Sequence, residues 1–304
     1  MKIAIGPSSF AAASTAPLER LKKAGCEIVP NPFGRRLTEV EIIDHLKGID
    51  GLIAGLEPLN EKVLTQADEL KAIARVGIGM TNVDEQAAAK LGIKVSNTPE
   101  GPTNAVAEMC LSALLAIGRN LVSCNDALHK RQWDKQIGFS VAGTKVLLIG
   151  YGRIGRRFGE MLHFLAAEIW VCDPYLSSSD LLLGERLVSL KEGLSEVDVI
   201  SLHSGGIQQI LGPDEFAVLR QEAVLLNSAR GELVHEPSLI AALESGKIAG
   251  AWFDVFWQEP YEGALCNYPQ VLLTPHVSTY SKQCRLSMEM DAVENLLHDL
   301  TRAR

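Results

Sequence analysis

The sequence has too little positive charge for several classes of protein. Its 304 residues include 29 Lys and Arg against 37 Asp and Glu, which gives a formal net charge of −8. Proteins that bind nucleic acid or anionic membranes meet the phosphates with clustered Lys and Arg. The charge balance therefore argues against both partners and favours a small-molecule ligand.

Cysteine pairs and long apolar runs are also missing. The six cysteines lie far apart without a C-x-x-C spacing, which disfavours disulfides and a metal site and favours a cytoplasmic protein with reduced thiols. Gly6 and Pro7 interrupt any signal-like run at the N-terminus. The most apolar helical stretch, NAVAEMCLSALLAIG, contains Glu108 and is shorter than the roughly 20 residues that span a bilayer. We therefore expect no membrane segment.

What the sequence contains is a regular alternation of apolar runs and helical patterns, which is typical of βαβ units and parallel sheets. Residues 104–119 predict a helix that is fully buried, either in the core or between subunits, and a last helical pattern could return to pack on the first domain. The expected strands form two series: 2–5, 26–29, 51–55, 70–77 and 93–99, then 144–150, 168–173, 198–203, 223–229, 248–254 and 271–276. The fold class is therefore α/β.

The segment GYGRIG, residues 150–155, fits the pattern G-x-G-x-x-G between a predicted strand and a predicted helix. In this context Gly150 permits a tight turn, Gly152 lets the backbone approach a pyrophosphate, and Gly155 allows close helix packing. Asp173 ends the next strand, where an acid would bind the adenosine ribose and repel a 2′-phosphate. The segment therefore predicts NAD as the cofactor, although Asp173 could also be a simple turn residue before Pro174.

Polar residues follow the later strands of the second series. They are His203, Arg230, Asp254 and His276. Each has an ordinary explanation as a loop, turn, capping or salt-bridge residue. Ligands of open α/β sheets bind outside the carboxyl ends of the strands, so we expect these four side chains to meet in one crevice with the dinucleotide.

These segments resemble the D-isomer-specific 2-hydroxyacid dehydrogenases. The resemblance rests on NSARGELVHEP (227–237), AWFDVFWQEP (251–260), LLTPHVS (272–278), RVGIGMTNVD (75–84) and NTPEG (97–101). Arg75 and NTPEG are most similar to the phosphoglycerate dehydrogenases of that family. The resemblance implies two doubly wound domains: a flavodoxin-like substrate-binding domain, 1–98 completed by 280–304, and an inserted Rossmann NAD-binding domain, 99–279. It also implies a homodimer through the NAD-binding domain.

The resemblance implies specific roles as well. Arg230 would be the catalytic arginine that holds the carboxylate of a 2-hydroxy or 2-oxo acid, His276 the acid and base, and Glu259 the acid that orients His276. The backbone around Gly77 would hold the substrate carboxylate, and Arg75 would either bind a phosphate or pair with an acid such as Asp84. The implied substrate contacts are Arg75, Val76, Gly77, Ile78 and Gly79. The implied NAD contacts are Gly150, Gly152, Arg153, Ile154, Gly155, Asp173, His203, Ser204, Ser228, Ala229 and Asp254.

Two departures from the family pattern leave alternatives open. Where the family usually has His-x-Pro followed by a later Thr, this sequence has HSGG at 203–206. His235 stands at a position where the family frequently has an acidic residue. The sequence ends just after its last helical pattern, so we expect no regulatory domain of the kind that some phosphoglycerate dehydrogenases carry. The predicted function is an NAD-dependent dehydrogenase similar to phosphoglycerate dehydrogenase. The alternatives are a glyoxylate or hydroxypyruvate reductase and a non-enzymic NADH-sensing interaction protein.

Overall fold

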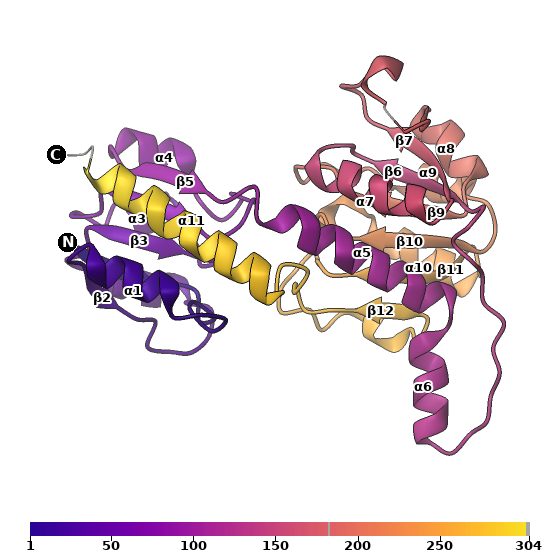
Figure 1. The fold of residues 1–304 in the computed structure, drawn as a ribbon, viewed down its shortest axis with the longest axis horizontal. Helices are drawn as coiled ribbons and strands as arrows, with labels where there is room; N and C mark the ends of the chain where they lie inside the picture. The colour runs from indigo at the N-terminus through magenta and orange to yellow at the C-terminus, as the bar shows by residue number, and fades with distance from the viewer. Residues whose placement is uncertain (182, 302–304) are drawn as a thin grey trace. The chain divides into compact units, whose positions relative to one another are not determined.

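The structure is a computed structural model that describes residues 1–181 and 183–301, and it contains two compact units. The first unit comprises Met1–Pro102 and the segment that begins at Thr279, and the second comprises Thr103–Ser278. The chain therefore passes between the units twice, and each unit has its own sheet and core (Figure 1).

The first unit is a five-stranded parallel sheet with helices on both faces. The strand order is β2-β1-β3-β4-β5, and the strands β3 and β4 at its centre are buried along their whole length. Strands buried on both faces read as continuous apolar runs, which explains the clear pattern of β3 and β4; the edge strands β2 and β5 were also predicted but are only partly buried. The strands are β1 (Lys2–Ile5), β2 (Glu27–Val29), β3 (Gly51–Ala54), β4 (Ala72–Arg75) and β5 (Lys94–Asn97).

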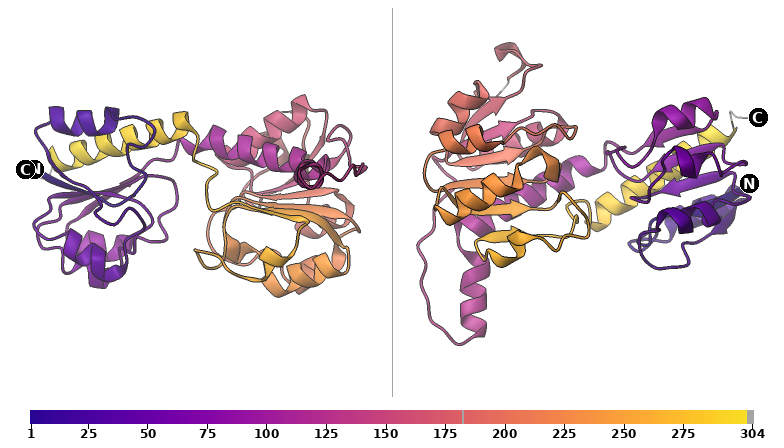
Figure 2. Two further views of the ribbon diagram at one scale, coloured as in Figure 1. Left: turned by 90° about the horizontal axis from the view of Figure 1, so that it is seen from below. Right: turned by 180° about the vertical axis from the view of Figure 1, so that it is seen from behind.

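Helices α1 and α11 pack against each other on one face of this sheet, and α2, α3 and α4 lie on the other (Figure 2). Helix α11 lies against β3, β4 and β5, as the last helical pattern of the sequence predicted. Three helices begin at side-chain caps: Thr38, Asn60 and Asp84 each accept a bond from an amide of the first turn. The helices are α1 (Ala16–Lys23), α2 (Glu39–His45), α3 (Glu61–Leu64), α4 (Glu85–Lys90) and α11 (Lys282–Thr301).

The second unit is a seven-stranded parallel sheet in the order β12-β11-β10-β9-β6-β7-β8. Six of its strands were predicted, and β8 was missed because it has only two residues. Side chains alternate between two core clusters, so that Val146 and Leu148 face one side of β6 while Leu147 and Ile149 face the other. The strands are β6 (Lys145–Ile149), β7 (Glu168–Cys172), β8 (Arg186–Leu187), β9 (Val199–Leu202), β10 (Ala223–Asn227), β11 (Ile248–Phe253) and β12 (Val271–Leu273).

Helices α5 and α7 supply residues to one of these clusters, and α8, α9 and α10 to the other. Helix α5 buries Ala107, Cys110 and Leu114 but exposes Glu108 and Leu115, so the expectation of a fully buried helix was wrong for the single chain. The helices are α5 (Pro102–Gly118), α6 (Leu121–His129), α7 (Arg153–Phe164), α8 (Leu190–Glu196), α9 (Pro213–Val218) and α10 (Glu236–Glu244), with short 3₁₀ turns at Ser178–Asp180, Gly231–Leu233 and Ala264–Asn267.

Helix α6 projects away from the sheet of the second unit (Figure 1), and none of its residues is buried. Within the described residues, no single helix is long and apolar enough to cross a membrane. Helices α5 and α6 satisfy that criterion only when they are taken together, and the chain bends by 61° between them.

Candidate active site

The strands of the second unit end in register along the carboxyl edge of its sheet. Ile149 of β6 lies beside Leu202 of β9, which lies beside Asn227 of β10. The register continues from Asn227 to Phe253 of β11, and from there to Leu273 of β12. The polar residues predicted to follow these strands therefore leave the sheet at one edge.

The loop between β6 and α7 has the close approaches that a dinucleotide requires. Gly150 has a φ of +88°, and a Cβ there would lie 2.7 Å from the amide nitrogen of Ser204. A Cβ on Gly155 would lie 2.4 Å from the carbonyl oxygen of Gly150, so the helix packs directly on the turn. Gly152 caps α7 with nothing within 4 Å of its Cβ position, and Arg153 and Ile154 open the helix. The N-terminus of this 12-residue helix has no side-chain cap, and a helix N-terminus of this kind can hold a pyrophosphate.

The carboxylate of Asp173 is held in place just after β7. Its Oδ2 accepts the amide of Tyr151 at 2.8 Å, and its Oδ1 accepts the amide of Tyr175 at 3.0 Å. The Tyr151 hydroxyl donates to Glu185, so a second acid lies beside the glycine loop. Burial and this carboxylate raise the pKa of Tyr151, which keeps its hydroxyl protonated. Glu185 precedes the unpredicted strand β8, and no sequence pattern pointed to it.

His203 and Ser204 support the glycine turn from the adjacent strand. The Nε2 atom of His203 lies 2.9 Å from the Ser201 hydroxyl, and the ring packs against Phe158 with centroids 5.6 Å apart. Burial lowers the pKa of His203 to about 4, so the ring is neutral at pH 7. The Ser204 hydroxyl donates to the carbonyl of Ile149 at 3.2 Å.

Asn227 shapes the turn that carries Ser228, Ala229 and Arg230. Asn227 is fully buried at the end of β10; its Nδ2 donates to the Arg230 carbonyl at 2.8 Å, and its Oδ1 accepts the Ala229 amide at 3.0 Å. The Arg230 guanidinium donates to the Ala229 carbonyl at 2.6 Å, and the Ser228 hydroxyl lies 3.3 Å from the sulfur of Cys110. Sequence reasoning missed Asn227, although an amide at the end of a buried apolar strand is a usable signal.

Gly231 brings the Arg230 turn against the loop that carries Glu259. A Cβ on Gly231 would lie 2.2 Å from the backbone carbon of Phe256 and 2.4 Å from the amide nitrogen of Trp257. No side chain fits between these backbones. The Arg230 turn and the Glu259 loop are therefore held in direct contact.

Glu259 and His276 form a hydrogen-bonded pair. The Nδ1 atom of His276 lies 3.0 Å and 2.9 Å from the two carboxylate oxygens of Glu259. Glu259 also accepts the amide of Phe256 at 3.3 Å, which orients its carboxylate. An ionised carboxylate can only accept, so Nδ1 donates the bond and Nε2 is the nitrogen available to a substrate.

The turn that carries His276 is held by Asp254. His276 has a φ of +54°, a conformation that non-glycine residues rarely adopt. The buried carboxylate of Asp254 accepts bonds from the Thr274 hydroxyl at 2.6 Å and the Val277 amide at 2.9 Å. It also accepts the amide and hydroxyl of Ser278 at 2.9 and 2.5 Å. The carboxylate predicted to line the NAD site thus holds the turn around the predicted acid and base.

The predicted substrate segment follows β4 in the first unit. Its first two amides are already used, because Val76 donates to the Ala54 carbonyl at 2.9 Å and Gly77 to the Thr98 hydroxyl at 2.8 Å. Within the described chain, the amides of Ile78 and Gly79 donate to no protein atom. The segment can therefore offer these two amides to a carboxylate.

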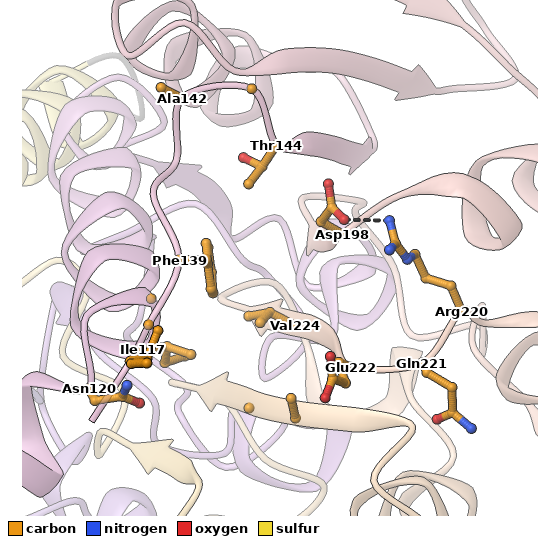
Figure 3. Close-up of a pocket in the computed structure, with 16 residues that line it drawn as sticks. Ile117, Asn120, Phe139, Ala142, Thr144, Asp198, Arg220, Gln221, Glu222 and Val224 are labelled. Atoms are coloured by element: carbon orange, nitrogen blue, oxygen red, sulfur yellow. Dashed lines mark hydrogen bonds and ion pairs between the residues drawn. The ribbon is translucent and has the colours of Figure 1, made fainter. Parts of the chain in front are cut away.

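A separate hollow of about 490 Å³ lies at the amino-terminal edge of the sheet of the second unit, where Thr144 and Val224 stand at the starts of strands (Figure 3). Two of its charged residues, Asp198 and Arg220, form an ion pair, and Asp198 also accepts the amide of Lys145 at 2.8 Å. None of the predicted site residues is among the described residues that line it. The hollow is therefore separate from the candidate active site.

Comparisons with known proteins agree with this geometry. A family model described as D-isomer specific 2-hydroxyacid dehydrogenase, NAD binding domain, matches residues 111–278. The chain is 31% identical over 268 residues to a D-3-phosphoglycerate dehydrogenase of Synechocystis sp., with 86% of this chain and 48% of that protein covered. It is 30% identical over 273 residues to glyoxylate/hydroxypyruvate reductase B of Yersinia enterocolitica, with 86% and 84% covered.

A solved structure similar along its whole length is the TT0316 protein from Thermus thermophilus. The TM-score is 0.90 at 30% sequence identity, with 100% of this chain and 98% of that chain covered. By contrast, the chain spans only about half the length of the phosphoglycerate dehydrogenase of Synechocystis sp..

Proposed function

We propose that this chain, which belongs to the D-isomer specific 2-hydroxyacid dehydrogenase family, interconverts a short 2-oxo acid and the corresponding D-2-hydroxy acid with NAD(H). The observation that carries the proposal is the Glu259–His276 pair, which stands at the same sheet edge as the Arg230 turn and the glycine loop. In the direction of reduction, a 2-oxo acid, NADH and a proton give a 2-hydroxy acid and NAD⁺.

Three residues divide the work. Bound NADH supplies the hydride. Arg230 offers a planar set of donors that hold the substrate carboxylate and polarise the carbonyl oxygen. His276 donates a proton from Nε2 to that oxygen and accepts it in the reverse direction. Glu259 holds Nδ1, so that the proton to be transferred is on the nitrogen that faces the substrate.

The second unit would bind the dinucleotide. The Gly150–Gly155 turn would hold the pyrophosphate at the N-terminus of α7, and Asp173 would accept a bond from the ribose 2′-hydroxyl. The two backbone amides that hold Asp173 support this role, because they point its carboxylate at the glycine loop. NAD is preferred to NADP because a 2′-phosphate would meet like charge.

The substrate could be phosphorylated or not. The relatives include phosphoglycerate dehydrogenases and glyoxylate or hydroxypyruvate reductases at similar identity. A non-enzymic protein that senses NADH is the alternative of another class. The well-formed Glu259–His276 pair favours catalysis over sensing, because a sensor has no use for a proton donor at this position.

The test is a screen of 2-oxo acids with NADH and NADPH. Purified protein should oxidise NADH with glyoxylate, hydroxypyruvate or 3-phosphohydroxypyruvate, and His276→Asn should abolish turnover while NADH binding remains. NADH binding without turnover of any of these acids would favour the sensor.

We also propose that the chain forms a homodimer through its second unit. Large apolar side chains are exposed on α6 and the segment after it: Leu121 (55%), Leu128 (56%), Trp133 (81%) and Ile137 (99%). Large apolar side chains exposed on a projecting segment are better explained by contact with a second copy than by exposure to water. Light scattering at micromolar concentration should give twice the chain mass. A monomer would contradict the proposal.

A further inference from the structure

The loop that carries Glu259 is closed on itself by two stacked aromatic rings. Phe256 precedes Glu259 and Tyr261 follows it, and the two ring centroids lie 4.5 Å apart with their planes inclined by 17°. The amide of Phe256 also donates to a carboxylate oxygen of Glu259 at 3.3 Å. The residue that stacks on Tyr261 is therefore the same residue whose amide orients Glu259.

Three contacts fix the side chain of Tyr261. Its hydroxyl donates to Oε1 of Glu236 at 2.5 Å and accepts the amide of Leu265 at 3.0 Å. A Cβ on Gly263 would lie 2.5 Å from the ring and from its oxygen, so any larger residue there would displace the ring. Burial and the Glu236 carboxylate raise the pKa of Tyr261, which keeps the hydroxyl protonated and able to donate.

Trp257 connects the same loop to the segment that follows Arg230. Its Nε1 donates to the Val234 carbonyl at 2.7 Å. Glu236, which accepts the bond from Tyr261, is the first residue of α10 and continues this segment. The two aromatic side chains therefore anchor the loop, on either side of its carboxylate, to the chain just after the Arg230 turn.

We propose that Tyr261 is a positioning residue for proton transfer, which holds Glu259 in the direction that keeps it bonded to Nδ1 of His276. This inference rests on the proposed function and adds a residue to it. Without the Tyr261 hydroxyl, the loop loses its bond to α10, and the carboxylate of Glu259 gains freedom to turn away from the ring. Reacting groups must be held by such supporting bonds to keep a productive geometry. The proton on Nε2 would then face the substrate in fewer of the bound complexes.

The first variant removes only the hydroxyl. Tyr261→Phe keeps the stacked ring but loses the bonds to Glu236 and Leu265. It should lower kcat with the preferred 2-oxo acid about tenfold, which is part of the loss of about 100-fold that a displacement of about 1 Å causes. KM for the acid should change less than kcat, because the substrate carboxylate is held by other groups. NADH fluorescence should report unchanged cofactor binding.

Tyr268→Phe is the matched control. Tyr268 donates to Glu244 at 2.8 Å, so it is also a tyrosine that bonds to a glutamate of α10. Glu244 is the last residue of that helix, whereas Glu236 is the first. The control therefore loses an equivalent bond at the other end of the helix, and its kcat should be unchanged.

A double-mutant cycle separates positioning from a general loss of folded protein. In a Glu259→Gln background the carboxylate that Tyr261 positions is already absent, so Tyr261→Phe should lower kcat little further. A loss of folded protein would lower kcat equally in both backgrounds. If Glu259→Gln has no measurable activity, the NMR signal of the His276 Nδ1 proton replaces the cycle. This signal, identified by its absence in His276→Asn, should shift or broaden in Tyr261→Phe but not in Tyr268→Phe.

Normal kcat in a folded Tyr261→Phe protein would overturn the inference, as would equal losses in the two backgrounds or an unchanged Nδ1 signal. If Tyr261→Phe does not fold, two variants of its partner give the answer. Glu236→Ala should lower kcat, whereas Glu236→Gln keeps an oxygen that accepts the hydroxyl and should retain most of it; equal activity of the two would contradict the inference. Failure of the proposed function looks different, because the parent protein would then reduce none of the 2-oxo acids.

Discussion

Gly231→Ala tests whether contact between two backbone loops organises the active site. An alanine Cβ would lie 2.2 Å from the Phe256 carbon and 2.4 Å from the Trp257 nitrogen. Carbon atoms in contact lie about 3.5–4.0 Å apart, so the loops must separate by more than about 1 Å. Overpacking of this kind lowers the free energy of unfolding by about 1–3 kcal/mol. The separation would also move Arg230 away from the Glu259 loop, and a displacement of about 1 Å lowers catalysis by about 100-fold.

Two measurements follow from this reasoning. We expect Gly231→Ala to lower kcat/KM for the preferred 2-oxo acid about 100-fold, and to lower Tm by about 2–4 °C for each kcal/mol lost. NADH binding should change little, because the glycine turn at 150–155 is not part of the contact. The control is Gly205→Ala, since nothing lies within 4 Å of that Cβ position. Activity and Tm of Gly231→Ala equal to those of the control would refute the reasoning.

Three further predictions concern single side chains. Arg230→Ala should lower kcat/KM by the equivalent of about 2–5 kcal/mol while NADH fluorescence still reports binding, and near-normal turnover would make Arg230 a structural residue. Asp173→Asn should narrow the preference for NADH over NADPH by about tenfold, and equal use of both cofactors by the parent protein would remove this role of Asp173. Burial lowers the pKa of His203 to about 4, so the unfolded chain binds a proton at a higher pH than the folded protein does. The free energy of unfolding should therefore fall by up to about 3 kcal/mol as the pH is lowered from about 6.5 to about 4. Urea unfolding of His203→Asn at pH 7 and pH 5 should show a weaker loss than the parent protein, and identical losses would contradict the assignment.

The sequence predicted the central strands well because they are buried on both faces, whereas the edge strands β2, β5 and β12 are only partly buried. Runs such as KVLLI and AVLLN leave little room for another interpretation. The exceptions follow the same physics. Strand β8 has one exposed and one partly buried residue, and α6 is an exposed helix without an apolar face towards the core, so neither produces a strong pattern.

The site was predictable only in part. The rule for carboxyl ends of parallel strands picked out His203, Arg230, Asp254 and His276, but the rule says nothing about which side chains bond to one another. The pairing of Glu259 with His276 came from resemblance to a family. The turn held by Asp254 depends on a positive φ at His276, which no periodicity records.

The four bonds to Asp254 also constrain how this protein can change over evolution. Once Asp254 is replaced, the hydroxyls of Thr274 and Ser278 lose their shared acceptor, so their own replacement does little further harm. A double-mutant cycle between Asp254 and either hydroxyl should therefore be strongly non-additive. The effect of a substitution at one of these positions would therefore depend on the residues at the others. A variant library that randomises them one at a time would underestimate the range of sequences able to support His276.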